Sequence, residues 1–290
     1  MGFHSLEEIV AKTREDKKPF WEVLLEDDMS DRMATREESL EKMNHMYQMM
    51  KKADQDYDAR LTSASGLVGQ DGERMQEYLR KGNHMSGNFI GKVTARALKM
   101  GESNACMKRI VAAPTAGSCG VIPAVFLTYQ ETYHRPDLEM VKALYVAAGI
   151  GMVIAERAFI AGATGGCQAE IGSASAMAAG GLAFLAGGGE EEILHAQSIA
   201  LKNLLGLVCD PVAGLVEVPC VKRNVIGAVN AVTSADMAMA GIKSKIPADQ
   251  VIDAMRSVGI TMPSALKETG EGGLAATPAG REAVAKLKKA

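Results

Sequence analysis

The sequence has few aromatic residues and little net charge. Phe, Trp and Tyr make up 4% of its 290 residues, and 32 Lys and Arg stand against 35 Asp and Glu, which gives a net charge of -3. The small number of aromatic side chains argues against a protein that stacks nucleic-acid bases on aromatic platforms. The absence of a basic excess argues against a polyanionic partner. We therefore expect no nucleic-acid-binding function.

Targeting signals and long, strongly apolar runs are also absent from the sequence. The first ten residues, MGFHSLEEIV, contain no apolar core of signal-peptide length. The weakly charged stretch 143–155 is ended by Glu156 and Arg157, and the stretch 171–189 consists mostly of Gly, Ala and Ser. We expect both stretches to form buried helices and no part of the chain to span a membrane.

The five cysteines include no closely spaced CxxC pair. An odd number of cysteines in a chain without an export signal is typical of the reducing cytoplasm. We therefore expect a cytoplasmic protein whose thiols serve a metal or catalysis in preference to disulfides.

Strand-like alternation of useful length is missing, whereas helical patterns run along most of the chain. The first hundred residues hold most of the charge, and the sequences SLEE from Ser5 and TREE from Thr35 predict two capped helix starts. Past residue 100, Gly and Ala dominate and favour closely packed helices. Helices are expected over 73–81, 86–100, 121–133, 138–161, 173–186, 190–205, 221–241, 247–258 and 279–289. We predict a mainly α, multi-helical fold in which a charged region (1–100) and a Gly/Ala-rich catalytic region (101–290) form one continuous domain.

Three of the cysteines lie beside residues that interrupt regular structure. Cys167 follows the glycine-rich AGATGG, Cys209 precedes an Asp-Pro pair, and Cys220 follows a proline. Glycine lets the backbone approach a bulky inorganic group, and proline interrupts a helix. The three thiolates suit a zinc ion with the neighbouring aspartate or water as fourth ligand, and they equally suit three irons of a [4Fe-4S] cluster with the fourth iron open. The other two, Cys106 and Cys119, are expected to act as small apolar residues.

Four segments resemble the α chain of bacterial iron–sulfur L-serine dehydratases (L-serine ammonia-lyases). They are AAPTAGSCGVIPA at 112–124, GGCQAEIGSASAMAA at 165–179, LKNLLGLVCDPVAGLVEVPCVKRNVIGAVNA at 201–231 and GGLAATPAG at 272–280. The resemblance runs over nearly the whole length and is weakest in the first eighty residues. The segment at 201–231 is the most specific of the four.

The resemblance implies a cofactor, its ligands and a reaction. Loops between helices would hold a [4Fe-4S] cluster through Cys167, Cys209 and Cys220, whereas Cys119 falls in a loop where related chains carry Ser or Ala. The implied lyase converts L-serine to pyruvate and ammonia, with an open iron as the Lewis acid that eliminates the β-hydroxyl. Two alternatives stay open: a cysteine-desulfurating lyase of the same superfamily, and a non-catalytic zinc protein with a Cys₃ site.

The resemblance also implies a partner. Single-chain members carry an SSHT motif in an N-terminal domain, and in some of them a terminal cysteine reaches the open iron. This sequence contains no SSHT and ends in KLKKA. In two-chain members the motif lies on a β subunit. We therefore expect a heterodimer or higher hetero-oligomer with a β subunit, acting on L-serine.

The carboxylate of such a substrate needs an anion-binding site. The loop Thr115–Gly120 precedes a predicted helix, and successive backbone N–H groups at that place suit a carboxylate. Candidate substrate-binding residues are Thr115, Gly117, Ser118 and, after Cys220, Asn224. The alternative is an ordinary glycine loop that caps a helix.

The general base is not identified by any motif. Glu170, three residues after Cys167, is a candidate, and its alternative is a structural bond to nearby backbone. His195 lies in an amphipathic pattern and is expected to be a packed or surface residue. A pyridoxal-phosphate dehydratase would need a Schiff-base lysine, for which Lys92 is the nearest candidate, but the strands of its α/β fold are missing.

Overall fold

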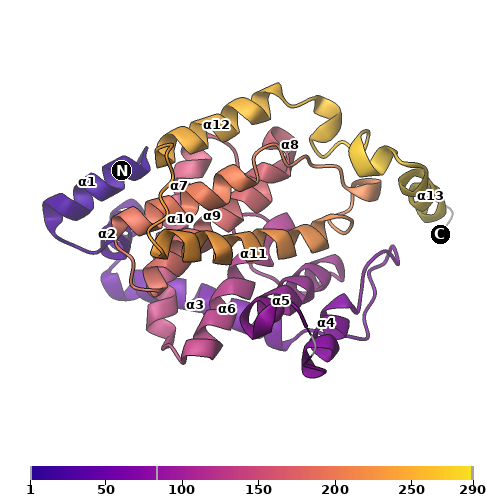
Figure 1. Cartoon of the computed structure of the whole chain (residues 1–290), viewed down its shortest axis with the longest axis horizontal. Coiled ribbons are helices and arrows are strands. Elements are labelled where there is room, and N and C mark those ends of the chain that lie inside the picture. The colour runs from indigo at the N-terminus through magenta and orange to yellow at the C-terminus, as the bar shows by residue number, and fades with distance from the viewer. Residues whose placement is uncertain (1, 83, 289–290) are drawn as a thin grey trace.

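The computed structural model describes residues 2–82 and 84–288, and within them the chain folds into helices joined by loops (Figure 1). The α-helices are α1 (Leu6–Asp16), α2 (Phe20–Arg32), α3 (Arg36–Gln55), α4 (Asp71–Arg80), α5 (Gly87–Ala105), α6 (Val121–Tyr133), α7 (Asp137–Arg157), α8 (Gly162–Gly165), α9 (Ser173–Leu185), α10 (Glu190–Asn203), α11 (Cys220–Met239), α12 (Ala248–Thr261) and α13 (Pro278–Leu287). Four short 3-10 helices are η1 (Ala116–Ser118), η3 (Val212–Gly214), η4 (Ser264–Leu266) and η5 (Gly273–Ala276), and η2 (Gln168–Gly172) is a π-helix. In the described residues, β-pairing is limited to an isolated bridge between Cys209 and Lys267. The predicted mainly α fold is confirmed.

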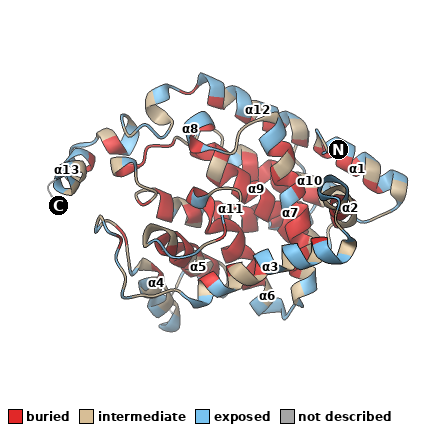
Figure 2. Ribbon diagram, turned by 180° about the vertical axis from the view of Figure 1, so that it is seen from behind, coloured by how far each residue is buried: buried red, intermediate tan, exposed pale blue. Residues whose placement is uncertain are grey.

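Helix α9 lies at the centre of the molecule, where α6, α7, α10 and α11 pack around it (Figure 2). All of its residues except Phe184 are buried. Two adjacent glycines permit this packing: a Cβ on Gly180 would lie 2.2 Å from Ile150 Cδ1, and one on Gly181 would lie 2.4 Å from Phe126 Cζ. The Gly/Ala-rich sequence therefore brings helices together at distances that larger side chains would prevent.

Helix α7 has the length and hydropathy of a membrane span, but 67% of its most apolar 18-residue window is buried inside the molecule. Leu144 and Ile150, for example, are fully or almost fully buried. This is the burial of a core helix. The two apolar stretches predicted to be buried therefore occur in buried helices, the first in α7 and the second in α9.

The N-terminal charged region contributes to the same hydrophobic core as the rest of the chain. Leu6 of α1 and Tyr47 of α3 belong to one buried cluster with Phe126 and Ile154. This shared core supports the proposal that residues 1–100 and 101–290 form one continuous domain. Helix α11 also packs along α5, so the two regions meet beside the cysteines.

The two predicted helix caps differ in outcome. At Thr35 both bonds of the capping box form, from Glu38 N to Thr35 Oγ1 (3.2 Å) and from Thr35 N to Glu38 Oε2 (2.8 Å). At Ser5 only the forward bond forms, from Glu8 N to Ser5 Oγ (3.0 Å), because the Glu8 carboxylate accepts from the backbone of His4 instead. The Glu8 carboxylate thus binds the amide one residue before the cap, at 2.7 Å.

Candidate metal and active site

The three predicted cysteines come from three different segments near the N-terminal end of α11. Cys167 lies between α8 and the π-helix η2, Cys209 lies in the loop between α10 and η3, and Cys220 is the first residue of α11. Their exposed fractions are 2%, 2% and 7%. Loops therefore carry two of the cysteines, whereas the third begins a helix.

The chain before Cys167 makes a turn that requires glycine. Gly166 has a φ of +77°, and a Cβ there would lie 2.7 Å from Met262 Sδ. Gln168 then fixes the start of η2, because its backbone N–H donates to Leu207 O (2.9 Å) and its side-chain oxygen accepts from Gly206 N (2.9 Å). The Cys167 turn and the chain leading to Cys209 are thus bound to each other.

The backbone of Cys209 is held from the other side by the segment after α12. Cys209 N donates to Leu266 O at 2.8 Å, and Glu268 N donates to Cys209 O at 2.7 Å. These two bonds form the isolated bridge of the fold. They fix the backbone of Cys209 against the segment 266–268, although the two segments are distant in sequence.

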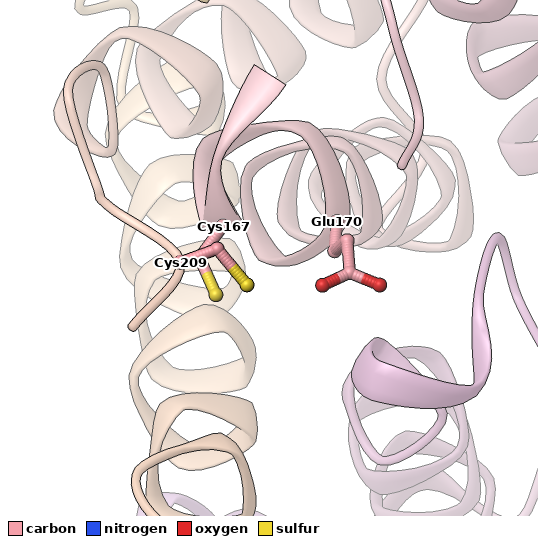
Figure 3. A group of neighbouring side chains, drawn as sticks. All are labelled: Cys167, Glu170 and Cys209. Carbon is pink, nitrogen blue, oxygen red and sulfur yellow. The ribbon is translucent and has the colours of Figure 1, made fainter. Parts of the chain in front are cut away.

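Cys167, Cys209 and Glu170 bring two sulfur atoms and a carboxylate together. Their ligand atoms all lie within 4.8 Å of one another. Figure 3 shows the two sulfurs side by side, with the Glu170 carboxylate extending from the next turn of the same helical segment. The three-residue spacing places Cys167 and Glu170 on one side of the turn, and the fold adds Cys209 from another segment.

Cys220 lies outside this group of three. Burial, and then the negative charges of Cys167 and Glu170, raise the pKa of Cys220 to about 12. Cys167 and Glu170, two members of that group, therefore also act electrostatically on Cys220. Cys220 is the first residue of α11, the helix that also carries Arg223.

The thiols of Cys167 and Cys209 interact directly. The Cys209 thiol donates to Cys167, which lowers the pKa of Cys167 against the effect of burial, and the Arg223 guanidinium adds to the lowering. The same bond, together with burial, raises the pKa of Cys209. The shared hydrogen bond and the nearby Arg223 therefore favour the thiolate form at Cys167 over Cys209.

Two glycines bring backbone directly against these groups. A Cβ on Gly162 would lie 2.9 Å from Cys209 Sγ and 2.8 Å from Glu170 Oε2, and one on Gly117 would lie 2.9 Å from Glu170 Oε1. Any larger residue would displace the sulfur or the carboxylate. Soft thiolate donors in a glycine-lined cradle fit an iron–sulfur cluster, and they also fit zinc. Sequence reasoning did not single out Gly162; its only signal was its place in AGATGG.

Glu170 is joined to the loop predicted to bind substrate. Thr115 Oγ1 donates to Glu170 Oε1 at 2.7 Å. Burial is the main cause that raises the pKa of Glu170, and the bond from Thr115 acts in the opposite direction. The bond predicted as the structural alternative for Glu170 thus comes from a side chain, and not from backbone.

The other two predicted substrate residues bind within the protein. The amide of Asn224 accepts from Gly120 N (2.8 Å) and donates to Gly117 O (2.8 Å) and Cys220 O (3.0 Å). Ser118 is fully buried, and its hydroxyl lies 3.2 Å from that of Thr115. Asn224 therefore fastens the 117–120 loop to α11, beside Cys220.

The model of the serine dehydratase alpha chain family matches residues 15–275. The chain belongs to this family. A protein of Bacillus subtilis named probable L-serine dehydratase, alpha chain, is 47% identical over 285 residues, which cover 98% of this chain and 95% of that protein. The L-serine dehydratase alpha chain of Peptoniphilus asaccharolyticus is 41% identical over 276 residues, 95% of this chain and 94% of its own length. The resemblance stated from the four segments is confirmed.

A second kind of relative matches over a shorter part. The L-serine dehydratase TdcG of Escherichia coli is 46% identical over 191 residues, which cover 65% of this chain and 42% of that protein. More than half of that Escherichia coli protein therefore lies outside the part that matches this chain.

Three further expectations of the sequence concern Cys106, Cys119 and Lys92, which lie outside the group of Cys167, Cys209 and Glu170. Cys119 is buried and lies 3.7 Å from Met100 O, so it is the small core residue expected, whereas Cys106 is only half-buried. Lys92 forms an ion pair with Glu131 at 2.7 Å, with both side chains nearly half exposed. The exposure of this lysine and its pairing with a carboxylate argue against the pyridoxal-phosphate alternative.

The structure also shows the surroundings of His195 and Asp210, two polar residues considered in the sequence analysis. His195 is half-buried on α10, where burial is the main cause that lowers its pKa. Asp210, the suggested fourth zinc ligand, binds the Arg223 guanidinium at 2.8 Å and accepts from Leu274 N at 2.8 Å. Both oxygens of its carboxylate are therefore already engaged, one by Arg223 and the other by the backbone of Leu274.

Proposed function

We propose that this chain is the α subunit of a [4Fe-4S]-dependent L-serine dehydratase, a carbon–nitrogen lyase that converts L-serine to pyruvate and ammonia. The observation that carries the proposal is the convergence of the Cys167 and Cys209 sulfurs and the Glu170 carboxylate within 4.8 Å. Membership of the serine dehydratase alpha chain family supports the reaction, because relatives in this family are named L-serine dehydratases.

In this proposal Cys167, Cys209 and Cys220 hold the cluster. Their burial, and the glycine backbone against Cys209, support a site from which water is largely excluded. When bound, the cluster supplies a Lewis-acidic iron that polarises the hydroxyl group of serine.

Glu170 is the general base of the proposed reaction. Its burial raises its pKa, which makes the carboxylate a stronger base than an exposed one. Because Oε1 accepts the hydrogen bond from Thr115, Oε2 is the atom left to take the Cα proton. Thr115 thereby orients the carboxylate as well as contacting it.

The 115–118 loop binds the substrate carboxylate in this proposal. Thr115 donates to Glu170, and the Gly117 backbone is so close to that carboxylate that a Cβ would clash with it, so an anion bound at this loop lies beside the base. Ser118 supports Thr115 from inside the loop, and Asn224 positions the loop on α11. These contacts orient serine for removal of its Cα proton.

A β subunit completes the enzyme in this proposal. The relatives that match nearly end to end are named alpha chains, and the Escherichia coli protein contains additional sequence beyond the matched 42%. The β subunit would supply what that additional sequence supplies. The proposed enzyme works in the cytoplasm, where thiols stay reduced.

The test is reconstitution of the full chain with ferrous iron and sulfide under anaerobic conditions. We expect bound iron with acid-labile sulfide, visible absorbance, and pyruvate formation from L-serine that rises strongly when the β subunit is added. Bound zinc without sulfide would overturn the proposal in favour of a scaffold. Faster sulfide release from cysteine than pyruvate release from serine would reassign the substrate.

A further inference from the structure

The guanidinium of Arg223 contacts three groups around Cys167 at once. Its Nη1 lies 3.5 Å from Cys167 Sγ and donates to Val208 O at 2.7 Å, and its Nη2 lies 2.8 Å from Asp210 Oδ1. Val208 and Asp210 flank Cys209 in sequence. One side chain of α11 therefore joins the Cys167 sulfur to both neighbours of Cys209.

Asp210 is itself fixed by the C-terminal part of the chain. Its side chain is 4% exposed, and its Oδ2 accepts from Leu274 N at 2.8 Å. Gly273 has a φ of +58°, and a Cβ there would lie 2.3 Å from Asp210 Oδ2. The GGLA segment therefore packs directly against the carboxylate that binds Arg223.

The contacts of Arg223 favour a role for this arginine at the thiol site over a role in general stability. A buried ion pair adds little net stability, because removing both charges from water costs about as much as their attraction returns. The planar fork of arginine can address an oxygen pair and a sulfur together, which the single ammonium of lysine cannot do.

We propose that Arg223 is a positioning residue for Cys167, and that Asp210, held by Gly273 and Leu274, positions Arg223. This inference rests on the proposed function, because it takes Cys167 as a cluster ligand. A cationic N–H directed at a ligand sulfur withdraws electron density from it, and hydrogen bonds to the sulfurs set the reduction potential of iron–sulfur clusters. Arg223 thus makes the cluster easier to reduce and slower to react with oxygen.

The test compares Arg223→Gln and Arg223→Lys with a matched control, Lys222→Gln. Lys222 is the adjacent residue, is exposed, and pairs with Asp71 at 2.8 Å. Each full chain is reconstituted anaerobically with ferrous iron and sulfide. Iron and sulfide content, the reduction midpoint from a potentiometric titration, and the rate of absorbance loss in air are then measured.

We expect Arg223→Gln to shift the midpoint to more negative potential, to bleach faster in air, and to lower the affinity for ferrous iron by roughly 10–100-fold. Arg223→Lys should recover part of each change, since it keeps the charge and loses the fork. Lys222→Gln should match the wild type. A wild-type midpoint and bleaching rate in Arg223→Gln would overturn the inference.

Gly273→Ala and Asp210→Asn test the same contacts from the far end. Both leave Arg223 in place, and we expect both to shift the midpoint in the same direction as Arg223→Gln, by a smaller amount. If Arg223→Gln does not fold, these variants and Arg223→Lys decide, and unchanged midpoints in all three would refute the inference. Failure of the wild type to bind iron and sulfide would instead refute the proposed function.

Discussion

Two arginines, one in the charged N-terminal region and one beside the thiols, are buried to almost the same extent. Arg96 on α5 is 17% exposed and Arg223 on α11 is 15% exposed. Arg96 directs its N–H groups only to oxygen atoms, those of Asp54, Thr128 and Glu131. Arg223 directs one of its N–H groups to a sulfur as well.

This difference separates a structural charge network from a site. Around Arg96 the charges compensate one another, and Lys99 adds a second cation on Asp54 at 2.8 Å. Around Arg223 the contacts include, besides the oxygens of Val208 and Asp210, a sulfur with chemistry of its own. The identity of the acceptor, more than the burial of the cation, is what supports the role that we propose for Arg223.

The largest expected effect follows from replacing the proposed ligands one at a time with serine, in Cys167→Ser, Cys209→Ser and Cys220→Ser. A serine hydroxyl is a hard donor that keeps its proton near neutral pH, so each variant should lose both the visible cluster absorbance and pyruvate formation. Iron and sulfide analysis together with a pyruvate assay would measure this. A cluster retained at wild-type content in any one variant would remove that cysteine from the ligand set.

Glu170→Gln should lower kcat by about 10²–10⁴-fold, because the amide cannot accept the Cα proton. The amide oxygen can still accept from Thr115, so iron and sulfide content should stay at the wild-type level. Thr115→Ser, which retains the hydroxyl donor, is the control and should remain active. Loss of iron from Glu170→Gln would instead make Glu170 a ligand.

Arg96→Gln should act on stability and leave the cluster unchanged. The buried Thr128 hydroxyl and two carboxylates would lose a charged donor, which costs about 1.5–3 kcal/mol of unfolding free energy for hydrogen bonds to charged groups. Denaturant unfolding would measure the loss, and iron content would serve as the control. A shift of the cluster midpoint in this variant would contradict the separation of the two regions.

Cys119→Ser should have the smallest effect. The hydroxyl can replace the thiol as donor toward Met100 O, so we expect a stability change of about 1 kcal/mol or less. Cluster absorbance and pyruvate formation should equal those of the wild type. Loss of the cluster would place Cys119 in the site after all.

Local sequence patterns predicted the helices well and the site only in part. The capping box at Thr35 formed as expected, and the Gly/Ala-rich stretch became the buried α9. The helix expected over 138–161 ends at Arg157, and η2 was not expected, because a π-turn leaves no periodic signal in five residues.

The sequence by itself determined that the protein is helical, that Cys167, Cys209 and Cys220 lie within two residues of glycine or proline, and that the chain resembles the serine dehydratase α chains. Those features depend on neighbouring residues and on short motifs. Only the tertiary structure brought Cys209 to Cys167 and Thr115 to Glu170, placed the backbone of Gly162 against Cys209, and directed Arg223 to the Cys167 sulfur. Each of these contacts joins segments that are distant in sequence, and helix periodicity carries no information about which distant segments meet.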